Sequence, residues 1–320
     1  MFRIPMIFPG QASQSVGMAS SLFEQNGPGS EFLSKINDTL GYDLTSLMFE
    51  GPAETLTETK NAQPAILAHS VAIAMELAAR DIKPSLVAGH SLGEYSAAVA
   101  AGAISAKKGL ALVRKRGELM FEAGNKQPGT MAAVMGLDSD SVSDVCKSIT
   151  ENVGTVVLAN HNSQSQVAIS GEVAAIDAAS EALKEAGAKR VIKLNVSGAF
   201  HSPLLEDAAT EFSVFLDSAG INGLEVPLVS NVTANAVSDK APFIDGLKKQ
   251  LTSSVRWYDT ITGISSGVFS DQVPKVVLEV GPGRVLSNMA RREFPDVTFI
   301  PVGTAEDLNN ILDKLNELSA

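Results

Sequence analysis

Short apolar runs that alternate with longer helical patterns constrain the fold of this chain most. Residues 4–8, 85–88, 227–230 and 275–279 read as buried strands, and helical patterns such as residues 63–79 and 93–100 lie between them. Strands covered by helices on both faces read as continuous apolar runs, as these do. The alternation predicts an α/β domain with a mainly parallel sheet.

The middle of the chain has a different order of predicted strands and helices. Strand patterns at residues 131–136, 156–159, 166–170 and 190–196 and helical patterns at 139–150 and 173–186 follow one another as β-α-β-β-α-β. This order is the ferredoxin-like arrangement. Residues 124–129, G-N-K-Q-P-G, have linker composition. We therefore expect a discontinuous, hydrolase-like α/β domain of residues 1–126 and 197–320, carrying a ferredoxin-like α+β insert of residues 127–196.

Composition excludes several classes of protein. The 320 residues are 45% hydrophobic, which supports a sizeable core, and the single cysteine, Cys146, rules out a disulfide framework. A net charge of −11 argues against nonspecific nucleic-acid binding. The first ten residues lack the pattern of a signal peptide, and the apolar stretch 64–79 is short and contains His69, Ser70 and Glu76. We expect a cytoplasmic protein that binds neither membranes nor metal ions.

The motif G-H-S-L-G-E at residues 89–94 lies directly between a predicted strand and a predicted helix. In that context G-x-S-x-G indicates a nucleophile elbow, a sharp turn that exposes its serine at the end of the sheet. The small residues Gly89 and Gly93 let the chain pass close by, and the helix N-terminus favours negative charge beside the hydroxyl. Ser91 is therefore the candidate nucleophile.

A serine hydroxyl needs a base to take its proton, and the chain has four histidines. His90 adjoins Ser91, and neighbours on such a turn point apart. His69 lies on an apolar helix and reads as a core histidine. His161 belongs to the insert, whereas His201 lies where the chain re-enters the large domain. Position alone favours His201 over His161.

Five motifs now coincide: F-P-G-Q-A-S-Q at residues 8–14, the serine motif, Arg116-Gly117, G-A-F-H-S at residues 198–202 and E-V-G-P-G at residues 279–283. In order and spacing the chain resembles the malonyl-CoA:acyl-carrier-protein transacylases of fatty-acid synthesis, over almost its whole length. The resemblance implies the same hydrolase-like fold with a ferredoxin-like insert.

The resemblance also implies roles for individual residues. Ser91 would be the nucleophile, His201 the general base, and Gln250 the glutamine that orients the histidine. The backbone N–H groups of Gln11 and Leu92 would form the oxyanion hole. Arg116 would bind the malonyl carboxylate, since its planar fork suits two parallel hydrogen bonds. The other pocket residues implied by the family are Met120, Phe200, Gln63, Asn160, Asn162 and Asn231.

One residue departs from the family pattern. The N-terminal motif usually reads F-P-G-Q-G-S-Q, and here position 12 is alanine. A positive φ would strain an alanine. We expect a negative φ at Ala12 and little effect on the loop that presents Gln11.

The expected activity is transfer of a malonyl group from malonyl-CoA to the phosphopantetheine thiol of acyl carrier protein, through a malonyl-serine ester and without a further cofactor. We expect a monomer. Carrier proteins are acidic, so a local basic patch is needed on this acidic chain. Its candidates are Lys189, Arg190, Lys193, Arg256, Arg284 and Arg291.

Three alternatives remain at this point. An acyltransferase serving a polyketide or malonate-decarboxylase carrier would use the same residues. A serine thioesterase would need a late histidine and an H-G-G-G-like oxyanion loop, but His201 is the last histidine and no such loop occurs. A carrier-binding scaffold with a dead site would form no acyl adduct.

Overall fold

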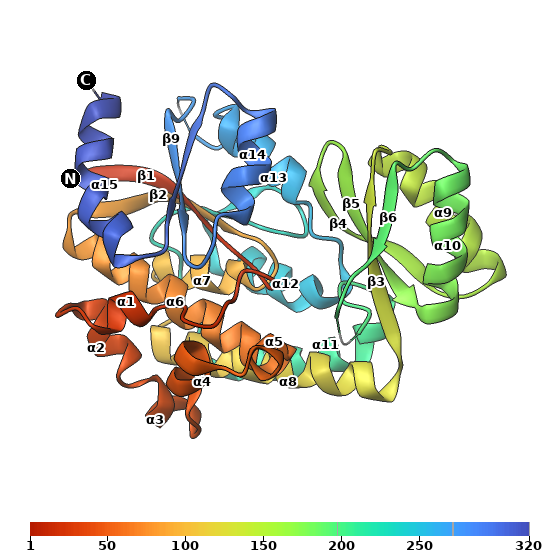
Figure 1. Cartoon of the computed structure of the whole chain (residues 1–320), viewed down its shortest axis with the longest axis horizontal. Coiled ribbons are helices and arrows are strands. Elements are labelled where there is room, and N and C mark those ends of the chain that lie inside the picture. The colour runs from red at the N-terminus through yellow and green to blue at the C-terminus, as the bar shows by residue number, and fades with distance from the viewer. Residues whose placement is uncertain (197, 271, 320) are drawn as a thin grey trace.

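Two lobes, each built on its own β-sheet, make up the computed structural model, which describes residues 1–196, 198–270 and 272–319 (Figure 1). The larger sheet has the order β10-β9-β1-β2-β7-β8. Every neighbouring pair is parallel except β7 and β8, which confirms the mainly parallel α/β fold. The strands are β1 (Phe2–Phe8), β2 (Ile82–Gly89), β7 (Leu228–Val229), β8 (Ala236–Val237), β9 (Val276–Val280) and β10 (Thr298–Val302).

Helices cover both faces of this sheet, as the continuous apolar strands require. Along β1, Met6 and Phe8 join one core cluster while Ile7 joins another on the opposite face. The first cluster includes residues of α6 (Thr59–Ala79), α8 (Ala106–Lys126), α11 (Glu206–Ser218), α12 (Lys240–Lys249) and α15 (Ala305–Ser319). The second includes residues of α13 (Trp257–Ser265) and α14 (Val285–Glu293).

Shorter elements complete the larger lobe. Five helices precede α6, and α7 follows β2. Two short 3₁₀ helices, η1 and η2, lie near α11 and α12. The bounds are α1 (Ser20–Phe23), α2 (Pro28–Leu33), α3 (Ile36–Leu40), α4 (Leu44–Glu50), α5 (Ala53–Thr57), α7 (Gly93–Ala100), η1 (Pro203–Leu205) and η2 (Gln250–Thr252).

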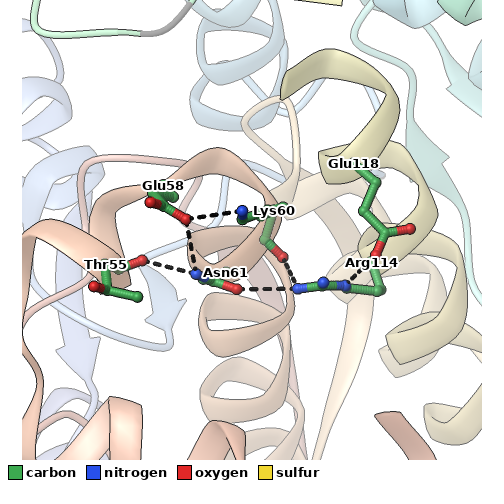
Figure 2. Close-up of polar contacts among 6 residues, drawn as sticks. All are labelled: Thr55, Glu58, Lys60, Asn61, Arg114 and Glu118. Atoms are coloured by element: carbon green, nitrogen blue, oxygen red, sulfur yellow. Dashed lines mark hydrogen bonds and ion pairs between the residues drawn. The ribbon is translucent and has the colours of Figure 1, made fainter. Parts of the chain in front are cut away.

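Helix α6 begins earlier than the sequence pattern indicated, so that Pro64 lies inside it. Proline has no N–H for the carbonyl four residues before it. The carbonyl of Lys60 instead accepts a hydrogen bond of 2.9 Å from Arg114 of α8 (Figure 2). Arg114 also donates to Asn61 at 3.0 Å and pairs with Glu118 at 2.6 Å. A side chain of the neighbouring helix therefore compensates for the proline.

The full length of α6 corrects our expectation that its apolar stretch is too short for a membrane. The helix has 21 residues and is long and apolar enough, by composition, to span one. In the structure 78% of its apolar window is buried inside the protein. Gly117 lets α8 cross it closely, because a Cβ at that position would lie 2.8 Å from the carbonyl oxygen of Thr59. Helix α6 is thus a core helix packed against α8.

The smaller lobe is formed by β3 (Gly129–Met135), α9 (Ser139–Asn152), β4 (Val156–Ser163), β5 (Gln166–Glu172), α10 (Val173–Glu185) and β6 (Arg190–Lys193). Its strands are ordered β4-β5-β3-β6 with antiparallel neighbours, which is the ferredoxin-like topology. The prediction of a linker at residues 124–129 was wrong in part, because α8 continues to Lys126. The domain limits stay a prediction, and Ser197, at the second limit, lies outside the described residues.

Main-chain hydrogen bonds join β4 to the larger lobe. The His161 N–H donates to the Val255 carbonyl at 2.9 Å, and the Val255 N–H donates to the Ala159 carbonyl at 2.8 Å. Asn160 and Val255 thereby form an isolated parallel bridge. This pairing holds Asn160 at the boundary between the two lobes, beside Val255, which lies five residues after Gln250 in the chain.

Candidate active site

The serine motif forms the predicted sharp turn between β2 and α7. Ser91 has a φ of 52°, in the left-handed region that residues other than glycine rarely adopt. The flanking glycines are required by packing. A Cβ at Gly89 would lie 1.9 Å from the Gly93 carbonyl carbon, and one at Gly93 would lie 2.1 Å from the Phe8 carbonyl oxygen. The turn therefore depends on both glycines and holds the Ser91 hydroxyl at the carboxyl end of the sheet.

The structure brings His201, and not His161, to this serine. Ser91 Oγ lies 2.8 Å from His201 Nε2, and His201 Nδ1 lies 2.9 Å from the main-chain carbonyl oxygen of Gln250. A carbonyl only accepts, so Nδ1 carries the proton and Nε2 is free to accept the serine proton. Burial, and then the charge of Arg116, lower the pKa of His201 from 6.5 to about 3. The imidazole is therefore neutral at pH 7.

The expected role of the Gln250 side chain needs correction. The histidine is oriented by the Gln250 main-chain carbonyl, whereas the side-chain amide turns to the other side of the elbow. Its Nε2 donates to the Ser91 carbonyl at 3.0 Å and to a carboxylate oxygen of Glu94 at 2.5 Å. Its Oε1 accepts from Arg116 at 3.0 Å. The main-chain geometry of η2 decides this arrangement, which residue type alone does not reveal.

Arg116 is fully buried on α8, with its guanidinium beside the nucleophile. Its Nη1 donates to Gln63 Oε1 at 2.9 Å and to Met120 Sδ at 3.2 Å. Its Nη2 donates to Gln250 Oε1 at 3.0 Å and to Ser91 Oγ at 3.2 Å. All four acceptors are neutral, so the charge of Arg116 has no direct counterion in these contacts. Burial lowers the pKa of the guanidinium, although the nearby Glu94 and Tyr95 oppose that shift.

Asn231 lies beneath the elbow and not in the pocket wall, which corrects the sequence-based expectation. It is 1% exposed. Its Oδ1 accepts from the Ser91 N–H at 2.7 Å, and its Nδ2 donates to the Gly89 carbonyl at 2.6 Å. Two hydrogen bonds from one amide thus hold both sides of the strained turn.

Glu94 is a further buried polar residue of the site. It is the last residue of the serine motif, and the sequence-based expectations assigned it no role. It follows Ser91 by three residues, which places it on the first turn of α7, and it is 1% exposed. Because Glu94 directly follows the G-x-S-x-G motif, its position in the sequence could have indicated that it lies beside the elbow. Burial raises the pKa of Glu94 to about 7, while the hydrogen bonds from Gln250 and Asn231 and the charge of Arg116 favour the ionised form.

A cavity of about 280 Å³ opens in front of Ser91 and His201, between the two lobes. Most of the expected pocket residues line it. They are Gln11, Gln63, Leu92, Arg116, Met120, Asn160, Asn162 and Phe200, joined from the smaller lobe by Met131, Ala133, Gln166 and Ala168. The smaller lobe therefore supplies one wall of the site, as the β4 pairing with Val255 allows.

Gln11 and Leu92, whose N–H groups are the expected oxyanion hole, both line this cavity. Among the hydrogen bonds of the described residues, none uses either N–H. The Gln11 loop is a tight turn in which the Ser13 N–H donates to the Gly10 carbonyl at 3.3 Å.

Ala12 occupies the third position of this turn with a φ of 78°, so the expectation of a negative φ was wrong. A type II turn demands φ > 0 at that position, which favours glycine. Gln14 Oε1 accepts from the Ala12 N–H at 2.8 Å and holds the conformation.

The remaining histidines have other surroundings. His69 is 4% exposed in the core, with Nε2 2.7 Å from the Gly303 carbonyl, and burial lowers its pKa to about 4. His90 Nε2 lies 2.8 Å from Asn162 Oδ1. His161 packs against the ring of Tyr258, with centroids 5.0 Å apart. Across the described ranges, no group of three or more His, Cys, Asp and Glu side chains could hold a metal ion.

Comparisons with known proteins agree with this site. A family model described as "Acyl transferase domain" matches residues 6–306. A malonyl CoA-acyl carrier protein transacylase of Bacillus subtilis (strain 168) is 42% identical over 99% of this chain and 98% of its own. A solved malonyl CoA-acyl carrier protein transacylase of Clostridium perfringens superposes with a TM-score of 0.92 at 34% identity, covering 99% of this chain and 98% of the other.

A third comparison concerns a solved malonyl-transacylase in complex with its type II PKS acyl-carrier protein. It has a TM-score of 0.91 at 37% identity and covers 98% of this chain and 99% of the other. Together, the serine–histidine pair, the buried arginine and these matches over nearly the whole length lead to one conclusion: the chain belongs to the acyl transferase domain family that includes the malonyl CoA-acyl carrier protein transacylases.

Proposed function

We propose that this enzyme transfers a malonyl group from malonyl-CoA to acyl carrier protein through an ester on Ser91. The proposal depends most on Arg116, which has two N–H groups that a substrate carboxylate could bind. The amide oxygens of Gln63 and Gln250 each take one N–H, from Nη1 and Nη2 respectively. The other N–H on each terminal nitrogen points to Met120 Sδ, a weak acceptor, or to Ser91 Oγ. A carboxylate can replace both and accept two parallel hydrogen bonds.

The first half-reaction follows from the serine–histidine geometry. His201 Nε2 takes the proton of Ser91 as Oγ attacks the malonyl thioester carbonyl. The free N–H groups of Gln11 and Leu92 would stabilise the oxyanion, each contributing about 3 kcal/mol. The tetrahedral intermediate then expels the coenzyme A thiolate, which takes the proton from His201. A malonyl-Ser91 ester remains.

The second half-reaction reverses the roles. The carrier's phosphopantetheine thiol gives its proton to His201 and attacks the ester carbonyl, and Ser91 leaves and recovers a proton from the imidazolium. Substrate and product are both thioesters, so one site serves both steps. The neutral His201 suits this exchange because it must accept and return a proton in each half.

Carrier docking requires exposed cations beside the cleft. Of the six basic candidates, Lys193 and Arg256 pair with Asp177 and Asp259, and Arg291 donates to the Phe299 carbonyl. We propose that the exposed Lys189, Arg190 and Arg284 contact the acidic carrier. The match to a malonyl-transacylase solved with a type II PKS carrier favours a polyketide carrier as the second candidate partner.

Intact-protein mass spectrometry after brief mixing with malonyl-CoA tests the proposal. We expect a malonyl adduct that forms on the native chain, is absent from Ser91→Ala and is discharged by a pantetheine thiol. An adduct discharged equally fast by water alone would indicate a thioesterase. The absence of any adduct would refute the acyl-serine mechanism.

A further inference from the structure

Glu94 is the one buried carboxylate within hydrogen-bond distance of the active-site framework in the contacts described above, and the proposed mechanism leaves it without a task. One carboxylate oxygen accepts from the Gln250 amide nitrogen at 2.5 Å, and the other accepts from the Asn231 N–H at 3.3 Å. Its own charge has no cation in direct contact there. Burying a carboxylate has a large free-energy cost unless its hydrogen bonds compensate, so these contacts call for an explanation.

The Gln250 amide has a donor end and an acceptor end, and only one orientation suits Arg116. A carboxylate accepts hydrogen bonds and cannot donate them when ionised. Glu94 therefore requires the amide nitrogen on its side, where the Ser91 carbonyl also accepts from it. The amide oxygen then faces Arg116 Nη2 at 3.0 Å. The reversed amide would place an NH₂ group against the guanidinium, donor against donor.

The orientation of the Gln250 amide also determines where the substrate-facing N–H of Arg116 points. With Gln250 Oε1 holding one N–H of Nη2, the other N–H of that nitrogen points to Ser91 Oγ at 3.2 Å. That N–H is one of the two available to a carboxylate. If Gln250 reversed, Arg116 would lose one of the two amide oxygens that fix the plane of its fork, and only Gln63 Oε1 on Nη1 would remain.

We propose that Glu94 is a positioning residue for malonyl selectivity, which acts by fixing the orientation of the Gln250 amide and so the plane of the Arg116 guanidinium. The inference rests on the proposed function, because it assigns Arg116 to the malonyl carboxylate. Glu94 touches neither substrate nor the reacting atoms. Its effect is on which acyl group is accepted, whereas the base, His201, is held independently by the Gln250 main chain.

The test replaces Glu94 by its neutral isostere, Glu94→Gln, and compares Ser91 acylation by malonyl-CoA and acetyl-CoA at pH 8. Burial raises the pKa of Glu94 to about 7, so the native carboxylate is ionised at this pH. Gln250 and Asn231 donate to different oxygens of Glu94, and a glutamine has only one oxygen, so the Gln250 amide is no longer held in one orientation. The fork then keeps only its contact with Gln63 to fix its plane. We expect the malonyl/acetyl ratio of kcat/KM to fall about tenfold or more, mainly through a higher KM for malonyl-CoA. The matched control is Glu279→Gln, which alters a fully buried carboxylate that accepts from the Leu286 and Ser287 N–H groups. The ratio should be unchanged there.

Two further variants separate positioning from a general structural effect. In an Arg116→Met background, Glu94→Gln should leave the ratio unaltered, because the two changes act through the same guanidinium. Gln250→Ala, which keeps the carbonyl under His201, should lower the ratio as Glu94→Gln does, and it serves if Glu94→Gln fails to fold. Equal losses with both donors in Glu94→Gln, or an unchanged ratio in either variant, would overturn the proposal. A native enzyme that does not prefer malonyl-CoA would instead refute the proposed function itself.

Discussion

Replacing Arg116 by methionine should convert a malonyl-selective site into one indifferent to the carboxylate. Methionine has a similar length and no charge, so it fills the buried space without the cavity that alanine would leave. The variant removes the two N–H groups available to a malonyl carboxylate, on Nη1 and Nη2. Hydrogen bonds to charged groups contribute about 1.5–3 kcal/mol each. Two of them amount to about 3–6 kcal/mol, or roughly 100-fold to 20,000-fold in the malonyl/acetyl ratio.

The assay measures single-turnover acylation of Ser91 by each thioester, with the adduct read by mass spectrometry. Arg114→Met is the matched control. Arg114 lies on the same helix but contacts Lys60, Asn61 and Glu118 (Figure 2). None of these four residues lines the cavity. We expect Arg114→Met to lower the melting temperature and leave the ratio intact. A malonyl/acetyl ratio in Arg116→Met within a few-fold of the native value would refute the assignment of Arg116.

Further predictions concern the framework of the site. Asn231→Ala should slow acylation by malonyl-CoA and acetyl-CoA about equally, by roughly tenfold, because Ser91 and Gly89 lose their shared amide; unequal losses in the same assay would contradict this role. Gly93→Ala should lower the melting temperature or prevent folding, since its Cβ would lie 2.1 Å from the Phe8 carbonyl; a variant that melts like the native protein would contradict that contact. Ala12→Gly should leave stability unchanged or raise it by up to about 1 kcal/mol in urea unfolding, and a clear loss would show that φ is not positive in solution. His69 and His201 have pKa values of about 4 and about 3 in the folded protein, below 6.5, so the unfolded chain takes up protons first as pH falls. Their contribution to stability is complete above pH 6.5 and is lost below it; Glu94, raised to about 7, opposes this with one proton between pH 4.5 and 7. Burial also lowers the pKa values of His90 and His161, which adds to the loss, and raises the pKa of Glu279, which opposes it. Urea unfolding should therefore show a net loss of stability, on the order of 1 kcal/mol per pH unit, as the pH falls from about 6 to 5. A stability that stays constant or increases as the pH falls would contradict the buried neutral histidines.

Much of the site could be predicted because its residues have local signatures. The turn around Ser91 needs glycine at two positions, and both the strand before it and the helix after it are visible as periodic patterns. The ferredoxin-like order of the smaller lobe was equally visible, since each of its elements is short and regular. The resemblance then selected His201, which position alone had only favoured.

The rest depends on contacts between segments far apart in the chain. Nothing local to Asn231 indicates that its side chain holds a turn 140 residues earlier. The main-chain carbonyl of Gln250, not its amide, meets His201, and residue type carries no information about main-chain direction. The positive φ of Ala12 was missed because alanine disfavours it, and the turn geometry overrides that preference.

The pairing of β4 with Val255 has a consequence for chimeric enzymes built on this fold. The Val255 N–H donates to the Ala159 carbonyl, and the Val255 carbonyl accepts from the His161 N–H. The next residue, Arg256, donates its N–H to the Asn231 carbonyl. A transplanted smaller lobe must therefore reproduce the register of one strand as well as two chain junctions. A slip of one residue would turn Asn160 from the cleft, because strand neighbours face opposite sides. It would also disturb the segment that carries Gln250 and Val255. Grafts should be cut so that this strand and its partner come from the same parent.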